Sequence, residues 1–144
     1  MKLEGCNALI TGASAGIGRE FARQLGGRAR SLILIARREQ RLNELRDELN
    51  RQYPKLAVSS RKIDLADLAQ LNELLAWLDH ERIDVDLLIN NAGLGDSGAF
   101  STSDPMRNEQ MTLVNIVALT DPAFGAEIGN VRWGEMQAEE IDAP

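Results

Sequence analysis

Short continuous apolar runs alternate along this chain with longer stretches in which apolar residues recur every three or four positions. The runs that predict strands lie at residues 8–10, 31–36 and 85–90, and a further short strand is expected to close at 63–65. The helical spacing predicts helices over residues 16–25, 39–52, 65–78 and 104–119. A strand that is apolar throughout is typical of a parallel sheet covered on both faces. The pattern therefore predicts an α/β fold with a doubly wound parallel sheet, of which these residues form the first four strands and their flanking helices.

A glycine-spaced turn follows the first apolar run. Gly12, Gly16 and Gly18 lie between that run and the first predicted helix, in which apolar residues recur every four positions from Ile17. A strand, a glycine turn and a helix together aim backbone N–H groups and a positive helix end at a phosphate, and glycine permits its close approach. The alternative is an ordinary strand-to-helix turn that happens to be rich in glycine, so the rest of the chain has to distinguish the two.

Four ordered motifs make this distinction. The chain contains Thr-Gly-x-x-x-Gly-x-Gly from Thr11, Asp-Leu at Asp64, Asn-Asn-Ala-Gly from Asn90, and Asn115 in the last predicted helix. In this order and at this spacing the motifs resemble the short-chain dehydrogenase/reductase family, over roughly residues 5 to 120. The resemblance implies a Rossmann-type, nucleotide-binding portion over residues 1–120 and an oxidoreductase that transfers hydride to or from a carbonyl or alcohol substrate.

The end of the second predicted strand favours NADP(H) over NAD(H). Dehydrogenases that prefer NAD usually place an acidic residue here, which accepts a hydrogen bond from the ribose 2′-OH. This chain has Ala36 instead, followed by Arg37 and Arg38. A guanidinium can bind a 2′-phosphate, and Ser14 offers a hydroxyl donor to the same group. The alternative is solvated charge, but cations are unfavourable at a helix N-terminus, so the pair indicates an anionic ligand.

Further cofactor contacts are implied by the resemblance alone. Asp64 would accept from the adenine amino group, with the Leu65 backbone beside it, although the N-cap of the third predicted helix explains Asp64 about equally well. Residues 91–93 would pass under the adenosine ribose. The complete set of cofactor-binding residues that we expect is Gly12, Ser14, Gly16, Ile17, Gly18, Arg37, Arg38, Asp64, Leu65, Asn91, Ala92 and Gly93.

The catalytic residues that the resemblance implies are found only in part. The family uses a Ser and a Tyr whose pKa is lowered by a Lys four residues later, because an ordinary phenol is too weak an acid at neutral pH. Asn115 matches the family member that steadies a water in the proton relay. The sequence has one tyrosine, Tyr53, and no Tyr-x-x-x-Lys. Two interpretations therefore stay open: an NADP(H)-dependent oxidoreductase, and a catalytically inactive dinucleotide-binding module or fragment.

The last part of the chain, residues 121–144, is loosely similar to the substrate loop of the family and the short helix that follows it. In full-length members a strand and a helix carrying the Ser, Tyr and Lys stand between this region and the helix of Asn115. We therefore expect the natural protein to carry further residues between Thr120 and Asp121.

Composition reduces the number of partner classes and cellular compartments that have to be considered. Sixteen basic and twenty-two acidic side chains give a net charge of −6, and no basic run is present, which argues against nucleic acid. No stretch reaches the ~18 apolar residues of a membrane span, no signal peptide is visible, and the lone Cys6 has no partner for an internal disulfide. We expect a cytoplasmic protein with a small-molecule substrate and no membrane partner. We also expect a homo-oligomer, because the strand at 85–90 would otherwise be an exposed apolar edge.

Overall fold

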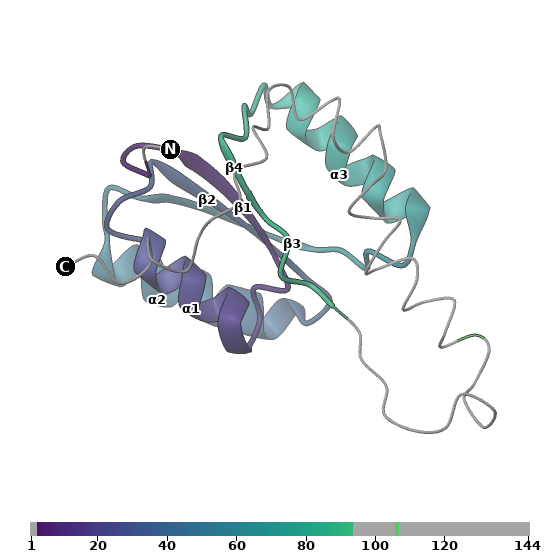
Figure 1. The fold of residues 1–144 in the computed structure, drawn as a ribbon, viewed down its shortest axis with the longest axis horizontal. Helices are drawn as coiled ribbons and strands as arrows, with labels where there is room; N and C mark the ends of the chain where they lie inside the picture. The colour runs from purple at the N-terminus through teal and green to yellow at the C-terminus, as the bar shows by residue number, and fades with distance from the viewer. Residues whose placement is uncertain (1–2, 94–105, 107–144) are drawn as a thin grey trace.

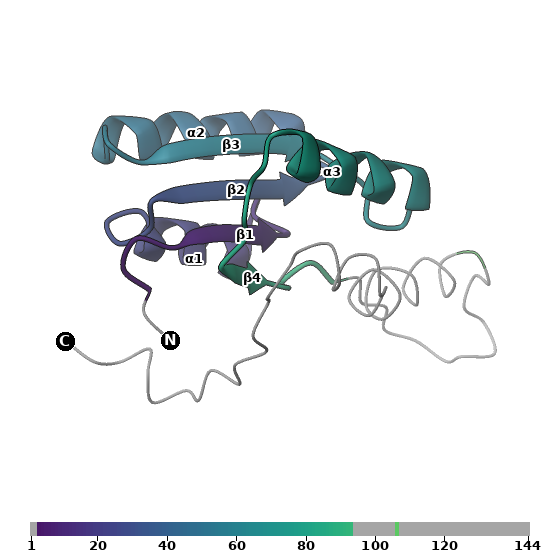
Figure 2. The same cartoon turned by 90° about the horizontal axis from the view of Figure 1, so that it is seen from above.

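The computed structural model describes residues 3–93 and residue 106. They contain a four-stranded parallel sheet with helices on both faces (Figure 1). The strands β1 (Asn7–Thr11), β2 (Ser31–Ala36), β3 (Ala57–Lys62) and β4 (Leu87–Ile89) lie in the order β3-β2-β1-β4, as Figure 2 shows. The helices α1 (Gly16–Leu25) and α2 (Glu39–Gln52) cover one face, and α3 (Leu68–His80) covers the other. The predicted doubly wound parallel sheet is confirmed.

Two apolar cores lie on the two faces of this sheet, because successive side chains of a strand point to opposite faces. Leu32 and Leu34 of β2 pack in the core beneath α1 and α2. Ile33 and Ile35 of the same strand pack in the core beneath α3. Burial on both faces is why β2 reads as a continuous apolar run. The leucines that recur at helical spacing in α2 are fully buried: Leu42, Leu45 and Leu49.

The third helix begins later than the sequence predicted. It runs over Leu68–His80 because Asp67 is its N-cap, whose side chain accepts hydrogen bonds from the N–H groups two and three residues later, at 2.9 and 3.4 Å. Asp64 is therefore not the N-cap of α3, which removes the alternative explanation considered for it. Leu68, which follows the cap, is 47% exposed and lies outside the core.

Two strands also differ from their predicted bounds. β3 ends at Lys62, so residues 63–65 follow this strand rather than close it. β3 pairs only with β2 among the described strands, and its serine and charged residues are typical of a strand at a sheet edge. β4 is limited to Leu87–Ile89 and lies at the other edge of the described sheet. Apart from residue 106, the predicted helix over 104–119 falls outside the described residues, as do Asn115 and residues 121–144.

The turn after β4 is fastened to the glycine turn after β1. The fully buried Thr11 hydroxyl accepts hydrogen bonds from the N–H groups of Asn91 and Ala92, at 3.1 and 3.0 Å. In return, the side-chain amide of Asn91 donates to the carbonyl oxygens of Thr11 and Gly12, at 3.2 and 3.3 Å. The same amide fills the space beside two glycines: a Cβ on Gly12 would lie 2.8 Å from it, and a Cβ on Gly18 would overlap it. Packing within the chain thus requires glycine at both positions.

We expect Gly18→Ala to lower the free energy of unfolding by about 1–3 kcal/mol, because the new methyl group has to displace the Asn91 amide or the Gly12 carbonyl. Urea denaturation followed by circular dichroism measures this change. Gly27→Ala is the matched control, since the nearest atom to its Cβ, on Tyr53, lies at an ordinary 3.4 Å. If the Gly18→Ala and Gly27→Ala chains were equally stable, the close packing around Asn91 would have no energetic importance.

A second brace joins α1 to α2 through Glu48. One carboxylate oxygen accepts from Arg23 Nε at 2.7 Å, and the other accepts from Arg23 Nη2 and Arg19 Nη2 at 3.1 and 3.2 Å. The hydrogen bond from Arg23 and, to a smaller extent, that from Arg19 hold the pKa of Glu48 below its usual 4.5. This brace holds the helix that follows the glycine turn against the helix that follows β2.

The stabilisation supplied by Glu48 should depend on pH. Since the folded-state pKa is lowered, the contribution is fully present above pH 4.5 and is lost as the pH falls through the folded-state value. At pH 7 we expect Glu48→Gln to reduce the free energy of unfolding by up to about 1 kcal/mol, the range for a partly exposed ion pair. Urea denaturation at pH 7 and in acid tests this, with Glu73→Gln as control because Glu73 has no ion pair among the described residues. A loss that persisted unchanged in strong acid would contradict the ionic origin.

Candidate functional site

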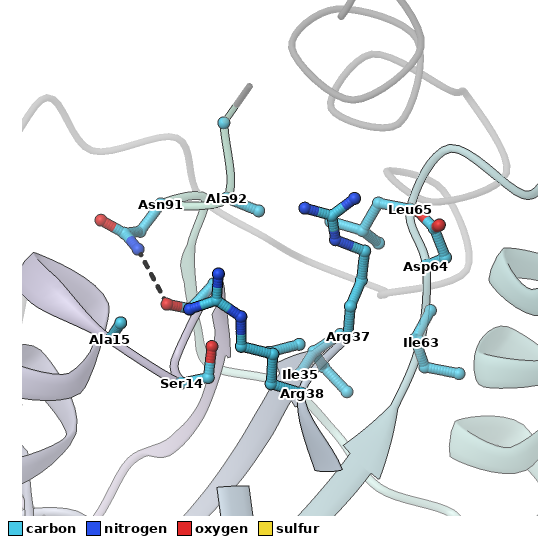
Figure 3. A pocket seen from close by; sticks show the side chains of 13 residues that line it. Ser14, Ala15, Ile35, Arg37, Arg38, Ile63, Asp64, Leu65, Asn91 and Ala92 are labelled. Carbon is cyan, nitrogen blue, oxygen red and sulfur yellow. Dashed lines mark hydrogen bonds between the residues drawn. The ribbon is translucent and has the colours of Figure 1, made fainter. Parts of the chain in front are cut away.

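The carboxyl ends of the four strands surround one cavity of about 270 Å³ (Figure 3). Its walls come from the glycine turn, the end of β2, the residues after β3 and the turn after β4. This is the edge at which open parallel sheets bind ligands. The cavity is lined by most of the residues that the sequence predicted for cofactor binding: Gly12, Ser14, Arg37, Arg38, Asp64, Leu65, Asn91, Ala92 and Gly93.

The other three predicted residues, Gly16, Ile17 and Gly18, form the first turn of α1 and do not line this cavity. Gly16 has a φ of +56°, a conformation that side chains rarely adopt, and the space where its Cβ would lie is open. Ile17 is 70% exposed. The N-cap residue, Ala15, supplies no side-chain hydrogen bond, so the first N–H groups of α1 are available to an anion.

Two arginines place unbalanced positive charge on the β2 side of the cavity. Arg37 and Arg38 are exposed, and neither has a hydrogen bond or ion pair within the described part of the chain. Other arginines, such as Arg23 and Arg28, are paired with carboxylates. Arg38 is also the N-cap residue of α2, where a cation is unfavourable and where its side chain makes no capping hydrogen bond. Asp64, the carboxylate that lines the same cavity, forms no ion pair with either arginine within the described residues, so a bound anion could supply their counter-charge.

The β3 side of the cavity combines apolar surface with one carboxylate. Ile63 and Leu65 line it and are largely buried. Between them, Asp64 accepts from the Ala66 N–H through Oδ1 at 3.0 Å, and its own N–H donates to Gln70 at 2.9 Å. These bonds leave Asp64 Oδ2 without a partner among the described residues. An apolar wall beside a carboxylate oxygen can hold a flat ring that carries an amino group.

The sequence analysis did not single out Asn90 as a site residue. Asn90 follows β4 directly, and its side-chain oxygen is buried without a hydrogen-bond partner among the described residues. A buried acceptor left unsatisfied is unfavourable by about 1–3 kcal/mol, but Asn90 is not among the residues that line the cavity. Both asparagines belong to the Asn-Asn-Ala-Gly motif. Sequence alone could not show that the Asn91 side chain bonds to the glycine turn, whereas the side-chain oxygen of Asn90 has no partner among the described residues.

Within residues 3–93 and at residue 106 there is no cluster of three His, Cys, Asp or Glu side chains that could hold a metal ion. The same part of the chain has no helix with the length and apolarity needed to cross a membrane.

Tyr53 ends α2 and packs against Gly26 instead of lining the cavity. Cys6 is buried, and desolvation raises the pKa of its thiol, which makes it unreactive.

Comparison with known proteins agrees with this geometry. A family model described as short chain dehydrogenase matches residues 6–123. An uncharacterized oxidoreductase of Mycobacterium tuberculosis is 36% identical over 110 residues, which cover 76% of this chain and 44% of the relative. An NADP-dependent 3-hydroxy acid dehydrogenase of Schizosaccharomyces pombe is 42% identical over 94 residues, which cover 65% of this chain and 36% of the relative.

The solved structures agree as well. A short-chain dehydrogenase from Sphingobium yanoikuyae in complex with NADPH superposes with a TM-score of 0.77 at 34% identity, over 85% of this chain and 46% of that one. The chain spans less than half the length of each of these relatives. Fold, motifs and matches agree over the same residues, and the chain therefore belongs to the short-chain dehydrogenase family.

Proposed function

We propose that this chain provides the cofactor-binding portion of an NADP(H)-dependent oxidoreductase that transfers hydride to or from a carbonyl or alcohol. The observation that carries the proposal is that Arg37 and Arg38, which have no ion pair among the described residues, line the same cavity as the glycine turn. In this proposal residues 1–120 form the dinucleotide-binding portion and residues 121–144 the substrate-loop-like tail. The relatives with NADP or NADPH in their names support the cofactor class.

The residues around the cavity fit the chemical groups of such a cofactor. The open N–H groups at the start of α1 suit the pyrophosphate, and Arg37 and Arg38 with Ser14 suit the 2′-phosphate. Asp64 Oδ2 suits the adenine amino group, and the backbone of residues 91–93 suits the adenosine ribose. When bound, the nicotinamide supplies or accepts the hydride. This chain's own residues bind the cofactor, neutralise its charge and orient it.

Proton transfer is the part of the reaction for which this sequence lacks the family's residues. Hydride addition to a carbonyl needs a general acid whose pKa lies near the working pH, and the sequence has no Tyr-x-x-x-Lys to provide one. We propose that Asn115 steadies a water in the proton relay. The missing phenol and ammonium also favour a second candidate function, a dinucleotide-binding module that does no chemistry.

We further propose a cytoplasmic protein whose substrate is a small molecule. We also propose that it assembles with itself, because β4 lies at an edge of the described sheet and a sheet edge is a template for pairing.

The natural coding sequence distinguishes the two candidate functions. If the oxidoreductase is correct, we expect further codons between Thr120 and Asp121 that encode a Ser and a Tyr-x-x-x-Lys. A chain restored in this way should oxidise NADPH in the presence of a carbonyl substrate, whereas the 144-residue chain should not. Sequencing the source transcript is the measurement. A transcript that joins Thr120 directly to Asp121 would leave the binding module as the better candidate.

The cofactor preference can be measured on the chain as it stands. Isothermal titration calorimetry should give a dissociation constant for NADPH about tenfold or more below that for NADH, because charged hydrogen bonds contribute roughly 1.5–3 kcal/mol. The double variant Arg37→Ala/Arg38→Ala should bind the two cofactors equally. Arg41→Ala is the matched control, as it removes an exposed cation of α2 that does not line the cavity. Equal affinity of the parent chain for NADPH and NADH would contradict the proposed preference.

A further inference from the structure

A groove of about 490 Å³ runs along the outer edge of β3. One of its flanks is formed by α2, through Glu39 and Arg46, and the other by α3, through Leu74 and Trp77. In Figure 2, β3 is the strand at the edge of the sheet farthest from β4. This hollow, which we call the β3-edge groove, shares only Ile63 with the residues that line the cavity at the carboxyl ends of the strands.

The backbone of β3 presents hydrogen-bonding groups to the groove. Its first residue, Ala57, and the residue after its end, Ile63, donate their N–H groups to carbonyl oxygens along β2, at 3.2 and 3.1 Å. Because alternate residues of a strand bond to the same neighbour, the odd-numbered residues here face β2. The even-numbered residues turn their N–H and C=O groups outward: Val58, Ser60 and Lys62. No other described strand pairs with this edge, so these groups can receive a further strand.

The flank beside α2 carries a cation next to this outward backbone. The Ser60 hydroxyl donates to Asn43 of α2 at 3.1 Å and accepts from Arg46 at 3.5 Å, which places the even-numbered side chains of β3 on this side. Lys62 is exposed and has no ion pair within the described residues. Its ammonium is therefore available to an anionic side chain on an added strand.

The flank beside α3 combines a cation with an aromatic surface. Arg61 lies over the half-buried Trp77 ring, 4.0 Å from the ring centre. Counting both flanks, three cations line the groove against two carboxylates, Glu39 and Glu73. The balance of charge in the groove is thus positive, whereas the whole chain has a net charge of −6.

These charges discriminate between possible strands. A lysine on an edge strand disfavours indiscriminate pairing, because like charges that face each other across two strands are destabilising. Opposite charges in the same position are stabilising. Lys62 and Arg61 therefore disfavour a cationic strand at this edge and favour an acidic one.

We propose that the β3-edge groove binds an extended acidic segment of another protein, which adds to the sheet as a further strand beside β3. Its main chain would pair with the outward groups of residues 58, 60 and 62, and its carboxylates would lie beside Lys62. Side chains of alternate residues would lie on the other flank, against Trp77. In such recognition the main-chain hydrogen bonds supply affinity and the alternating side chains supply specificity. The proposal does not depend on the proposed cofactor site.

Hydrogen exchange measured by NMR on the full chain tests the backbone pairing. In the free chain we expect the N–H groups of residues 58, 60 and 62 to exchange rapidly and those of 59 and 61 slowly. The probe is a synthetic peptide of six residues, the length of β3, in which Glu and Val alternate. At about ten times its dissociation constant it should slow exchange at 58, 60 and 62 by about tenfold. A peptide of alternating Lys and Val should leave the exchange unchanged.

A proline on the outward side separates binding from folding. Ser60→Pro removes an N–H group that bonds to nothing in β2, and prolines are tolerated at such positions of edge strands. We expect this variant to fold, as judged by circular dichroism, and to lose binding of the Glu-Val peptide. Ser60→Ala is the matched control, since it removes the hydroxyl bonds to α2 but keeps the N–H group, and it should bind as the parent chain does.

Charge reversal tests the preference for an acidic strand without changing the backbone. Lys62→Glu should weaken the Glu-Val peptide about threefold or more. Arg41→Glu is the control that should not lower the affinity by that factor, because Arg41 is an equally exposed cation of α2 that does not line the groove.

Three results would overturn the proposal. The first is slow exchange at 58, 60 and 62 without any peptide, which would mean that this edge is already covered. The second is a smaller assembly for Ser60→Pro than for the parent chain in analytical ultracentrifugation, which would make a second copy of this chain the occupant. The third is equal binding of the Glu-Val and Lys-Val peptides, or of the Glu-Val peptide by the Ser60→Pro and Ser60→Ala chains.

Discussion

The contact between the turn after β4 and the glycine turn after β1 is the constraint on which the rest of the site depends. Four hydrogen bonds of 3.0 to 3.3 Å join the two segments. The buried Thr11 hydroxyl accepts two of them, from the backbone N–H groups of Asn91 and Ala92, and the Asn91 side-chain amide donates the other two, to the carbonyl oxygens of Thr11 and Gly12. Because the Asn91 amide occupies the space next to Gly12 and Gly18, the start of α1 can come no closer and cannot rotate freely. The position of the helix N-terminus follows from this packing.

The same arrangement explains why this end of the sheet is suited to an anionic ligand. The chain as a whole carries a net charge of −6, and most charged side chains near the two helices on that face are paired, as in the Glu48 brace. At the cavity, Arg37 and Arg38 have no ion pair within the described residues, and the first N–H groups of α1 receive no side-chain cap. The local positive potential comes from groups that the fold leaves unsatisfied.

Catalysis places a different demand on the protein than binding does. Binding needs backbone N–H groups, small residues and fixed charges at one edge of the sheet, all of which residues 3–93 provide. Reduction of a carbonyl also needs a proton donor of matched pKa beside the nicotinamide, and the sequence holds no Tyr-x-x-x-Lys for this purpose. Membership of the family, the cofactor site and turnover are therefore three separate conclusions, of which only the first follows from similarity.

The alternation of apolar runs and helical spacing was enough to predict the fold, and the bounds of β2 and α2 agree with it to the residue. β2 is buried along nearly its full length and α2 buries one regularly spaced row of leucines, so each element has a clear pattern in the sequence. The sequence pattern of β3 was weak, because an edge strand with serines and charged residues has no apolar run. The start of α3 was missed because aspartate at 64 and at 67 is equally suitable as an N-cap. Only the folded backbone shows that Asp64 accepts from Ala66, ahead of the helix, whereas Asp67 accepts from an N–H group in the first turn of α3.

At the site, sequence determined which residue types gather at the carboxyl edge, because glycine turns, Arg-Arg and Asn-Asn-Ala-Gly each follow a strand. Tertiary structure decided what each of them does. Gly18 is required by the Asn91 amide of a distant turn, and Asn90 carries a buried oxygen that has no partner among the described residues. Arg37 and Arg38 are alike in sequence but face different walls of the cavity. These distinctions depend on side chains about 25 to 80 positions away, and local spacing carries no information about such contacts.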